Sequence, residues 1–248
     1  MKQRAKLAEA SVHPFPEQTK RNKLKLKIDD LKVFDPLTKN QAKFFELYKQ
    51  GTQAIMLHGA AGTGKTFIAV YKALEEVMDK SNPYQRLVIV RSVVPSRDIG
   101  HLPGDEKEKT DVYLAPYKAI CQDLFDTDQA YERLVEQKNI EFMITSFVRG
   151  ITIDNAIIVV DECQNMNFQE LSSIMTRVGN NTKIIFCGDF KQTDLCKKGD
   201  QSGLKEFVDI VNHMPSFRNV EFEVEDIVRS SLVKEFIVAN LHIQTTKS

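Results

Sequence analysis

Residues 59–66 combine the residue types and the spacing with the clearest chemistry in this chain. They read Gly-Ala-Ala-Gly-Thr-Gly-Lys-Thr and match the pattern G-x-x-x-x-G-K-[ST] between a strand-like apolar run and a helical pattern. In that setting backbone N–H groups and the N-terminus of a helix surround phosphates, whereas an ordinary glycine turn is the alternative. The pattern predicts that Lys65 contacts the β- and γ-phosphates and that the Thr66 hydroxyl binds Mg²⁺. The expected nucleotide-binding residues are Gly59, Ala60, Ala61, Gly62, Thr63, Gly64, Lys65 and Thr66.

Two adjacent carboxylates, Asp161 and Glu162, follow an apolar run at residues 157–160. If that run is a buried strand, both groups lie at one edge of a sheet. We expect Asp161 to hold the Mg²⁺ shell, usually through water, and Glu162 to orient or deprotonate the attacking water. Adjacent Asp and Glu at this point favour nucleotide hydrolysis, and a charged turn at the end of a strand is the alternative.

Two glutamines are further candidates. Gln192 lies three residues after Gly188-Asp189, which ends another apolar run, and its amide could sense the γ-phosphate. Gln41 precedes the glycine loop, and a side-chain amide can pair with N6 and N7 of adenine. Each has a plainer interpretation, because Gly-Asp is a frequent turn and Gln41 on its own is a polar residue near a helix start.

Two arginines, Arg177 and Arg229, are candidates for a finger that reaches the γ-phosphate. A guanidinium there offsets charge that develops in the transition state. On the residues alone, a solvated surface arginine is the favoured interpretation of both.

Alternating strand and helix patterns would position these side chains. Strands are expected at residues 54–58, 87–91, 141–146, 156–160, 183–187 and 220–224, and helices at 66–79, 116–125, 168–177, 204–211 and 231–239. This alternation, with near-continuous apolar strands, predicts an α/β fold with a mostly parallel sheet and helices on both faces. We also expect a short edge strand at 24–28, a helix capped by Thr38 and a functional loop at 92–117.

The length of 248 residues and the 42% hydrophobic content suit one sizeable domain, expected at 36–248, behind an extension at 1–35. Residues 1–32 hold nine basic and four acidic side chains, so this segment could touch phosphate backbones or be a solvated arm. The four cysteines lack metal or disulfide spacing, which predicts reduced thiols. Without a membrane-length apolar run or a signal peptide, a cytoplasmic protein is expected.

Several segments together resemble the PhoH-like ATPases. They are residues 59–66, the segment 91–104 with its Leu-Pro-Gly end, the run 146–152 with Arg149-Gly150-Ile151-Thr152, and residues 161–165. The resemblance continues through 175–179, 188–195 and 226–233 and covers about residues 36–240. It is specific, because the Leu-Pro-Gly and Arg-Gly-x-Thr runs are not general features of phosphate-loop proteins.

The resemblance implies a RecA-like phosphate-loop NTPase, similar to the motor core of superfamily 1 helicases, with ATP and Mg²⁺ as cofactors. It also implies an adenine contact for Gln41, a helicase-like third motif that includes Gln192, and an arginine finger from Arg177 or Arg229. The family has been associated with RNA-related activity and ring-like assemblies. Single-stranded RNA or DNA and further copies of the chain, such as a hexameric ring, are therefore expected partners. The compact length is similar to bacteriophage versions, which would act in the host cytoplasm.

The expected function is Mg²⁺-dependent ATP hydrolysis coupled to single-stranded nucleic acid, with RNA favoured. A nucleotide-gated binding or assembly module with slow hydrolysis is the alternative, because only one of the two motor domains of a superfamily 1 helicase is present. A small-molecule kinase is a weaker third interpretation. Contacts to the polymer are expected from Arg91, Arg97, Arg149 and the loop 107–109, although residues 105–109 carry both charge signs and could be a solvated face.

Overall fold

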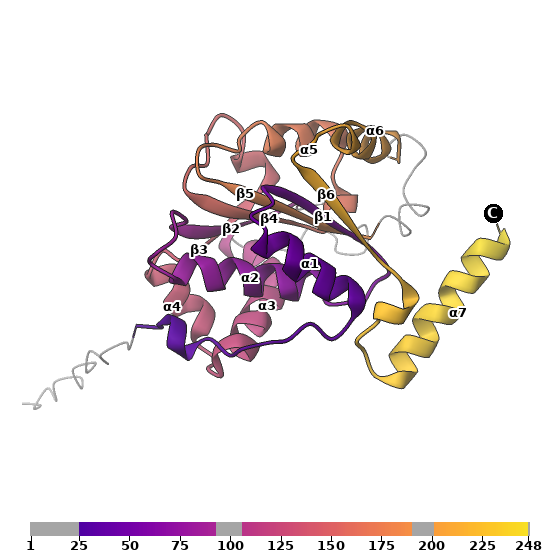
Figure 1. Ribbon diagram of the computed structural model, residues 1–248, viewed down its shortest axis with the longest axis horizontal. Helices are drawn as coiled ribbons and strands as arrows, with labels where there is room; N and C mark the ends of the chain where they lie inside the picture. Colours follow the sequence, from indigo (N-terminus) through magenta and orange to yellow (C-terminus); the bar gives the residue numbers. More distant parts are fainter. Residues whose placement is uncertain (1–24, 93–105, 190–200, 248) are drawn as a thin grey trace, which may run out of the picture.

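Six parallel strands form the centre of the computed structural model, which describes residues 25–92, 106–189 and 201–247 (Figure 1). The strand order is β3-β2-β4-β5-β1-β6, and every neighbouring pair is parallel. Carboxyl ends of parallel strands meet at one edge of the sheet, so loops from several strands converge there. The strands are β1 (Ala54–Gly59), β2 (Arg86–Arg91), β3 (Ile140–Ile144), β4 (Ala156–Asp161), β5 (Lys183–Gly188) and β6 (Phe217–Phe222).

Helices cover both faces of this sheet, as the apolar strands predict. In β1, Ile55 and Leu57 belong to the core on one face, whereas Ala54 and Met56 belong to the core on the other. This double burial explains why the strands are apolar along their whole length. One face packs against α1 (Lys39–Lys49), α2 (Lys65–Met78), α3 (Glu106–Phe125) and α4 (Ala130–Glu136), and the other against α5 (Phe168–Met175) and α6 (Gln201–Asn212).

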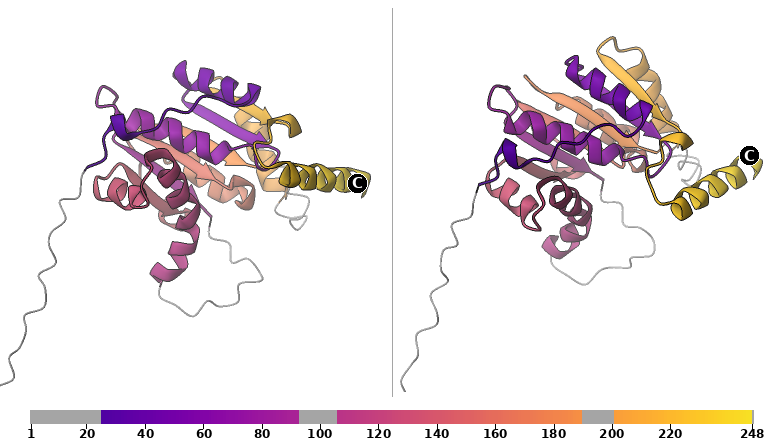
Figure 2. Two further views of the ribbon diagram at one scale, coloured as in Figure 1. Left: turned by 90° about the horizontal axis from the view of Figure 1, so that it is seen from below. Right: turned by 60° about the horizontal axis from the view of Figure 1, so that its bottom comes forward.

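The last helix, α7 (Ser231–Lys247), extends away from these layers, as two further views show (Figure 2). Within the described ranges, no helix combines the length and the apolar character that crossing a membrane requires. The fold is the α/β, RecA-like phosphate-loop arrangement expected from the sequence.

Several element boundaries differ from those predicted. The charged residues 106–109, expected in a loop, begin α3, and Pro116 lies inside that helix instead of at its start. Residues 217–222 form β6, which therefore begins and ends earlier than predicted. The described residues 25–27 form no strand, and a short 3-10 helix follows at Ile28–Asp30, so the predicted edge strand is wrong.

The segment at residues 25–35 packs against the helical layer. Leu26 and Leu31 are buried, and Phe34 makes edge contacts with Phe67 and Tyr71 of α2 at ring-centroid distances of 5.1 and 5.6 Å. Apolar contacts of this kind hold the segment that enters α1, whose N-terminus is capped by the Thr38 hydroxyl as expected. The division of the chain into residues 1–35 and 36–248 stays a prediction.

Candidate nucleotide site

The glycine loop connects β1 to the N-terminus of α2 at the carboxyl edge of the sheet. Gly59 has a φ of +111°, and a Cβ there would lie 2.1 Å from the carbonyl oxygen of Phe222. Only glycine fits so close to β6 with this backbone conformation. Gly62 and Gly64 also have positive φ values, of 74° and 81°, and α2 begins at Lys65. The loop and the N–H groups of the first helical turn therefore form the anion-binding arrangement that the sequence predicts.

Lys65 is held inside this loop. Its Nζ donates hydrogen bonds to the carbonyl oxygens of Ala60 at 2.7 Å and Gly59 at 3.1 Å. Burial lowers the pKa of Lys65, while the carboxylates of Asp189 and Glu162 act in the opposite direction. The ammonium group thus lies beside the loop backbone and in the field of two carboxylates, where a phosphate group would be a further partner.

Thr66 and Asp161 meet at the same edge, although 95 residues separate them in the sequence. The Thr66 hydroxyl donates to Asp161 Oδ1 at 2.6 Å, and Asp161 is buried at the end of β4. Mg²⁺ prefers oxygen ligands, commonly one or two carboxylates with phosphate oxygens and waters. One hydroxyl and one carboxylate in contact fit that requirement. No group of three or more His, Cys, Asp or Glu side chains in the described ranges could hold a metal ion.

Glu162 is the next residue after Asp161, and its backbone is in the left-handed region, with a φ of 51°. Its Oε2 accepts a hydrogen bond from Gln164 Nε2 at 2.5 Å, and Gln164 Oε1 accepts one from the Asp189 backbone N–H at 3.1 Å. Gln164 is buried and thereby connects the Asp-Glu motif to the end of β5. Nothing in the sequence pattern points to this link, because it depends on which strands are neighbours.

Gln192, the remaining part of the third motif, lies outside the described residues.

Gly188 ends β5 at a position where only glycine fits. A Cβ at this position would lie 2.5 Å from the sulfur of Cys163 and 2.8 Å from Gln164 Oε1. The close approach of β5 to the residues after β4 is therefore possible only without a side chain.

Gln41 lies beside the glycine loop, as the sequence predicts, but both ends of its amide have backbone partners. Its Nε2 donates to the carbonyl oxygen of Thr63 at 2.9 Å, and its Oε1 accepts from the Leu37 N–H at 2.8 Å. Gln41 is also buried. These contacts connect α1 to the loop, and the adenine contact stays a prediction that would require an exchange of partners.

The two candidate arginines lie at opposite edges of the sheet. A Cβ on Gly62 would lie 3.0 Å from Cγ and 3.7 Å from Nε of Arg229, so this side chain lies against the glycine loop. Arg177 accepts a backbone hydrogen bond from Ile153, which precedes β4, and therefore lies at the amino edge. Of the two candidates, Arg229 therefore lies near the glycine loop and Arg177 lies away from it.

The loop after β3 presents an aromatic side chain at the carboxyl edge. Phe147 is 66% exposed, and Arg149 two residues later is also exposed. The buried Val148 anchors the loop between them, and the Thr145 hydroxyl donates to Glu170 Oε1 of α5 at 2.7 Å. This pairing of a base-sized ring with a cation was not apparent from the sequence. Arg97 and the side chains at 107–109 lie outside the described residues.

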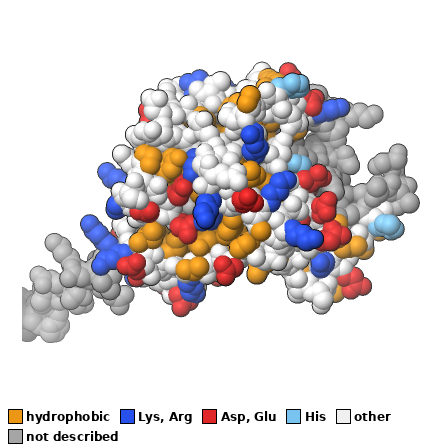
Figure 3. Space-filling model, viewed as in Figure 1, with side chains coloured by type: hydrophobic (Ala, Val, Ile, Leu, Met, Phe, Trp, Pro, Cys, Tyr) orange, Lys and Arg blue, Asp and Glu red, His pale blue; other side chains and the backbone are white. Residues whose placement is uncertain are grey.

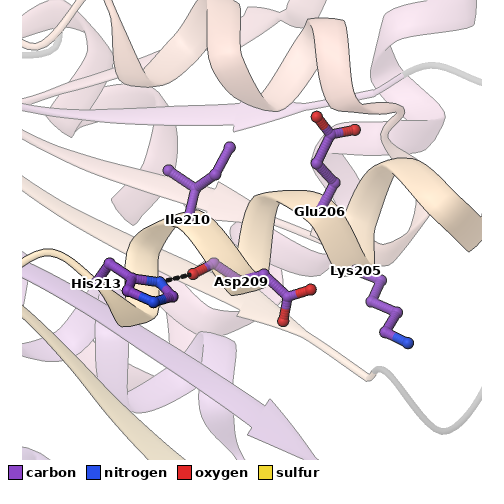
Figure 4. Close-up of a pocket in the computed structure, with 5 residues that line it drawn as sticks. All are labelled: Lys205, Glu206, Asp209, Ile210 and His213. Atoms are coloured by element: carbon purple, nitrogen blue, oxygen red, sulfur yellow. Dashed lines mark hydrogen bonds between the residues drawn. The ribbon is translucent and has the colours of Figure 1, made fainter.

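Among the described residues, neither the surface charge on one face nor the hollow against α6 indicates a second site. In the face viewed in Figure 3, Lys and Arg alternate with Asp and Glu, and no broad basic area is visible. A hollow of about 420 Å³ lies against α6, but its lining residues all come from that one helix and its C-terminal end (Figure 4). They are Lys205, Glu206, Asp209, Ile210 and His213, and His213 Nδ1 lies 2.7 Å from the Asp209 carbonyl oxygen.

Comparison with known proteins identifies the family. The sequence profile described as PhoH-like protein matches residues 33–240. The chain belongs to the PhoH-like family. The PhoH-like protein of Bacillus subtilis is 36% identical over 182 residues, which cover 73% of this chain and 56% of the relative. Protein PhoH of Escherichia coli is 32% identical over 206 residues, which cover 82% and 57%. The chain thus spans little more than half the length of these curated PhoH-like relatives.

Two solved structures align with most of this chain at low sequence identity. The large terminase of a thermophilic bacteriophage aligns with a TM-score of 0.47 at 15% identity, covering 82% of this chain and 50% of the terminase. The SWI2/SNF2 ATPase core of Sulfolobus solfataricus aligns with a TM-score of 0.43 at 14% identity, covering 77% and 47%. The fold assignment of this PhoH-like chain rests on its own sheet and glycine loop.

Proposed function

We propose that this chain is a Mg²⁺-dependent ATP hydrolase that is coupled to single-stranded nucleic acid. One observation carries the hydrolase part: the Thr66 hydroxyl lies 2.6 Å from the carboxylate of Asp161, beside Lys65 and Glu162. Residues that would bind phosphate, hold Mg²⁺ and activate water then lie together at one sheet edge.

The residues of the site divide the reaction between them. Loop N–H groups, the N-terminus of α2 and the Lys65 ammonium would bind and orient the β- and γ-phosphates. Mg²⁺ held by Thr66 and Asp161 would neutralise charge on the phosphate oxygens when bound. Glu162 would orient a water toward the γ-phosphorus and accept its proton as the new P–O bond forms and the bond to the ADP oxygen breaks. Arg229 would offset charge on the γ-phosphate from above Gly62.

The hydrogen bond from Gln164 would determine how readily the Glu162 carboxylate accepts a proton from water. Its amide donates to the same carboxylate that must accept a proton, and it also holds the backbone of Asp189 at the start of the third motif. A change in that motif on loss of the γ-phosphate would therefore reach Glu162 through one side chain. This connection supports a site whose hydrolysis responds to its surroundings.

Support for the nucleic-acid part comes from the loop after β3. Exposed aromatic rings bind single strands by stacking on bases, and nearby arginines pair with phosphates. Phe147 and Arg149 supply both in one anchored loop. RNA is the favoured polymer because of the family resemblance.

Steady-state ATP turnover tests the proposal. We expect turnover that requires Mg²⁺, that Lys65→Ala abolishes, and that single-stranded RNA stimulates more than single-stranded DNA or no polymer. Phe147→Ala should reduce the stimulation several-fold without changing turnover in the absence of polymer. Val135→Ala, at a 43% exposed position on α4, is the matched control and should change neither quantity. Wild-type turnover by Lys65→Ala would overturn the hydrolase assignment.

A nucleotide-gated binding module with slow hydrolysis is the second candidate. The hydrogen bond from Gln164 to Glu162 favours it, because a carboxylate engaged in this way is less free to accept a proton from water. Turnover that stays near the uncatalysed rate with every polymer, together with tight binding of Mg²⁺-ATP, would select this candidate over the motor.

A further inference from the structure

A buried tyrosine contacts the carboxylate that the proposed Mg²⁺ site uses. The Tyr117 hydroxyl of α3 donates to Asp161 Oδ2 at 2.7 Å, while the Thr66 hydroxyl donates to Oδ1 at 2.6 Å. The side chain of Tyr117 is fully buried, with 0% exposure. Each oxygen of Asp161 therefore has its own hydroxyl donor, and the two donors come from different helices on the same face of the sheet.

Further contacts hold Tyr117 in this position. Arg91 lies opposite Asp161 in the register of β2 and β4, and its guanidinium acts electrostatically on both Tyr117 and Asp161. The guanidinium carbon of Arg91 also lies 5.7 Å from the ring centroid of Tyr113, one helical turn before Tyr117. The ring of Tyr117 packs at 5.8 Å from that of Phe142 in β3. Arg91 of β2 and Phe142 of β3 thus hold the tyrosine in addition to Asp161.

We propose that Tyr117 is a positioning residue for Mg²⁺, which fixes the rotation of the Asp161 carboxylate so that Oδ1 faces Thr66. The terminal torsion of an aspartate has a broad energy profile, so a carboxylate held at one oxygen can rotate. A donor to the second oxygen removes that freedom. Partners that orient a metal ligand in this way commonly contribute 10- to 100-fold in metal affinity. The inference rests on the proposed function, because it assigns a role within the same site.

Tyr117→Phe separates this role from simple packing. The substitution keeps the buried ring and removes only the hydroxyl, so the fold is retained and Asp161 Oδ2 loses its donor. Tyr48→Phe is the matched control, because Tyr48 is equally buried but lies near Lys183 at the amino edge, with Lys183 Nζ 4.3 Å from its ring centroid. Both variants lose one buried hydroxyl, and only one of the two hydroxyls contacts Asp161.

The measurement is the affinity for Mn²⁺, read by electron paramagnetic resonance on the full chain with a non-hydrolysable ATP analogue. We expect Tyr117→Phe to bind Mn²⁺ about 10-fold more weakly, with the affinity for the analogue in EDTA within twofold of wild type. Turnover should show a raised half-saturating Mg²⁺ concentration, and kcat at saturating Mg²⁺ should recover most of its wild-type value. Tyr48→Phe should leave the affinity for Mn²⁺ unchanged.

The outcomes distinguish this inference from the function on which it rests. If wild type binds Mn²⁺ with the analogue and Tyr117→Phe binds it equally well, the positioning role is overturned and the hydrolase proposal stands. If Tyr48→Phe weakens Mn²⁺ binding as much as Tyr117→Phe does, the effect is a general destabilisation of the protein, and the inference is likewise overturned. If wild type binds neither the analogue nor Mn²⁺, both the inference and the proposed function are wrong.

Discussion

At the scale of single residues, the site depends on the close approach of backbone segments to one another as much as on reactive side chains. Gly188 has no side chain to separate β5 from Cys163 and Gln164. Gln164 can then accept from the Asp189 N–H and donate to Glu162 at the same time. A side chain at position 188 would push these residues apart and move the carboxylate of Glu162.

Gly188→Ala tests this dependence. Because a Cβ would lie 2.5 Å from Cys163 Sγ, we expect ATP turnover to fall at least 10-fold and the melting temperature to drop by several degrees. Gly51→Ala is the control, since its φ of +77° makes alanine unfavourable although nothing lies within 4 Å of the added Cβ. It should lower the melting temperature and leave turnover intact. Wild-type turnover by Gly188→Ala would contradict this account of Gln164.

Arg229 is the second test at this scale. A guanidinium that offsets transition-state charge contributes at least about 100-fold to kcat, so Arg229→Ala should lose that factor while ATP affinity changes only a few-fold. Arg218→Ala, which removes an exposed arginine of β6, is the control. Because Arg229 lies against the loop of its own subunit, mixing Arg229→Ala with Lys65→Ala protein should not restore turnover. Restored turnover would show that the finger acts between subunits.

At the scale of elements, short connections attach α1 and the segment after β6 to the glycine loop. Asp226 Oδ2 accepts hydrogen bonds from Asn40 Nδ2 at 2.6 Å and from the Glu223 N–H at 2.9 Å. Two residues later the Val228 N–H donates to the carbonyl oxygen of Gly62 at 3.0 Å. The position of the loop is therefore sensitive to the charge on Asp226.

This sensitivity predicts a dependence on pH. Burial raises the pKa of Asp226, but the hydrogen bonds from Asn40, Thr38 and Glu223 outweigh it and leave the pKa below its usual value. The resulting stability is present above the unfolded-state pKa of about 3.9 and is lost as pH falls through the lower folded-state pKa. Urea unfolding of Asp226→Asn should show lower stability at pH 7 than wild type and a smaller loss on acidification. An equal loss of stability on acidification in wild type and Asp226→Asn would contradict this role of Asp226. Asp123→Asn, at an exposed site, is the control.

The sequence predicts best those elements whose pattern lies within one short segment of the chain. The buried strands and α2 are predictable because long apolar runs and the glycine pattern need no knowledge of neighbours. Helix α4 has only seven residues with mixed polarity, so it escaped prediction, and α3 began earlier than expected because its first turns are charged. The sequence also indicates that Thr66 and Asp161 lie together, and the contact between them agrees with this, while their binding of Mg²⁺ stays a proposal. The contributions of Tyr117 and Gln164 were not, because they depend on packing between distant segments.

At the scale of the whole molecule, α7 stands apart from the sheet layers (Figure 2). Its apolar side chains are largely exposed to solvent: Leu232 at 74%, Val233 at 42%, Phe236 at 71%, Val238 at 40% and Ile243 at 54%. The same helix reaches the glycine loop through Ile237, whose Cδ1 would lie 3.3 Å from a Cβ on Gly62. A second copy of the chain that covered α7 would therefore lie next to the nucleotide site, where its Arg177 could contribute.

We therefore expect self-association through α7. Sedimentation velocity with Mg²⁺ and an ATP analogue should give a multiple of the subunit mass, and the double substitution Leu232→Asp, Phe236→Asp should shift the protein to monomer. Glu235→Ala, on the same helix, is the control and should assemble like wild type. A wild-type protein that stays strictly monomeric with full ATPase activity would exclude any role for Arg177 in a neighbouring site.

In the proposed function, the sheet edge at Lys65, Asp161 and Glu162 hydrolyses ATP, with Glu162 acting on the water. The most direct measurement compares ATP binding and single-turnover hydrolysis for wild type and Glu162→Gln under the same conditions. We expect Glu162→Gln to bind Mg²⁺-ATP within a few-fold of wild type and to hydrolyse it at least about 100-fold more slowly. Equal rates of hydrolysis by the two proteins would contradict it.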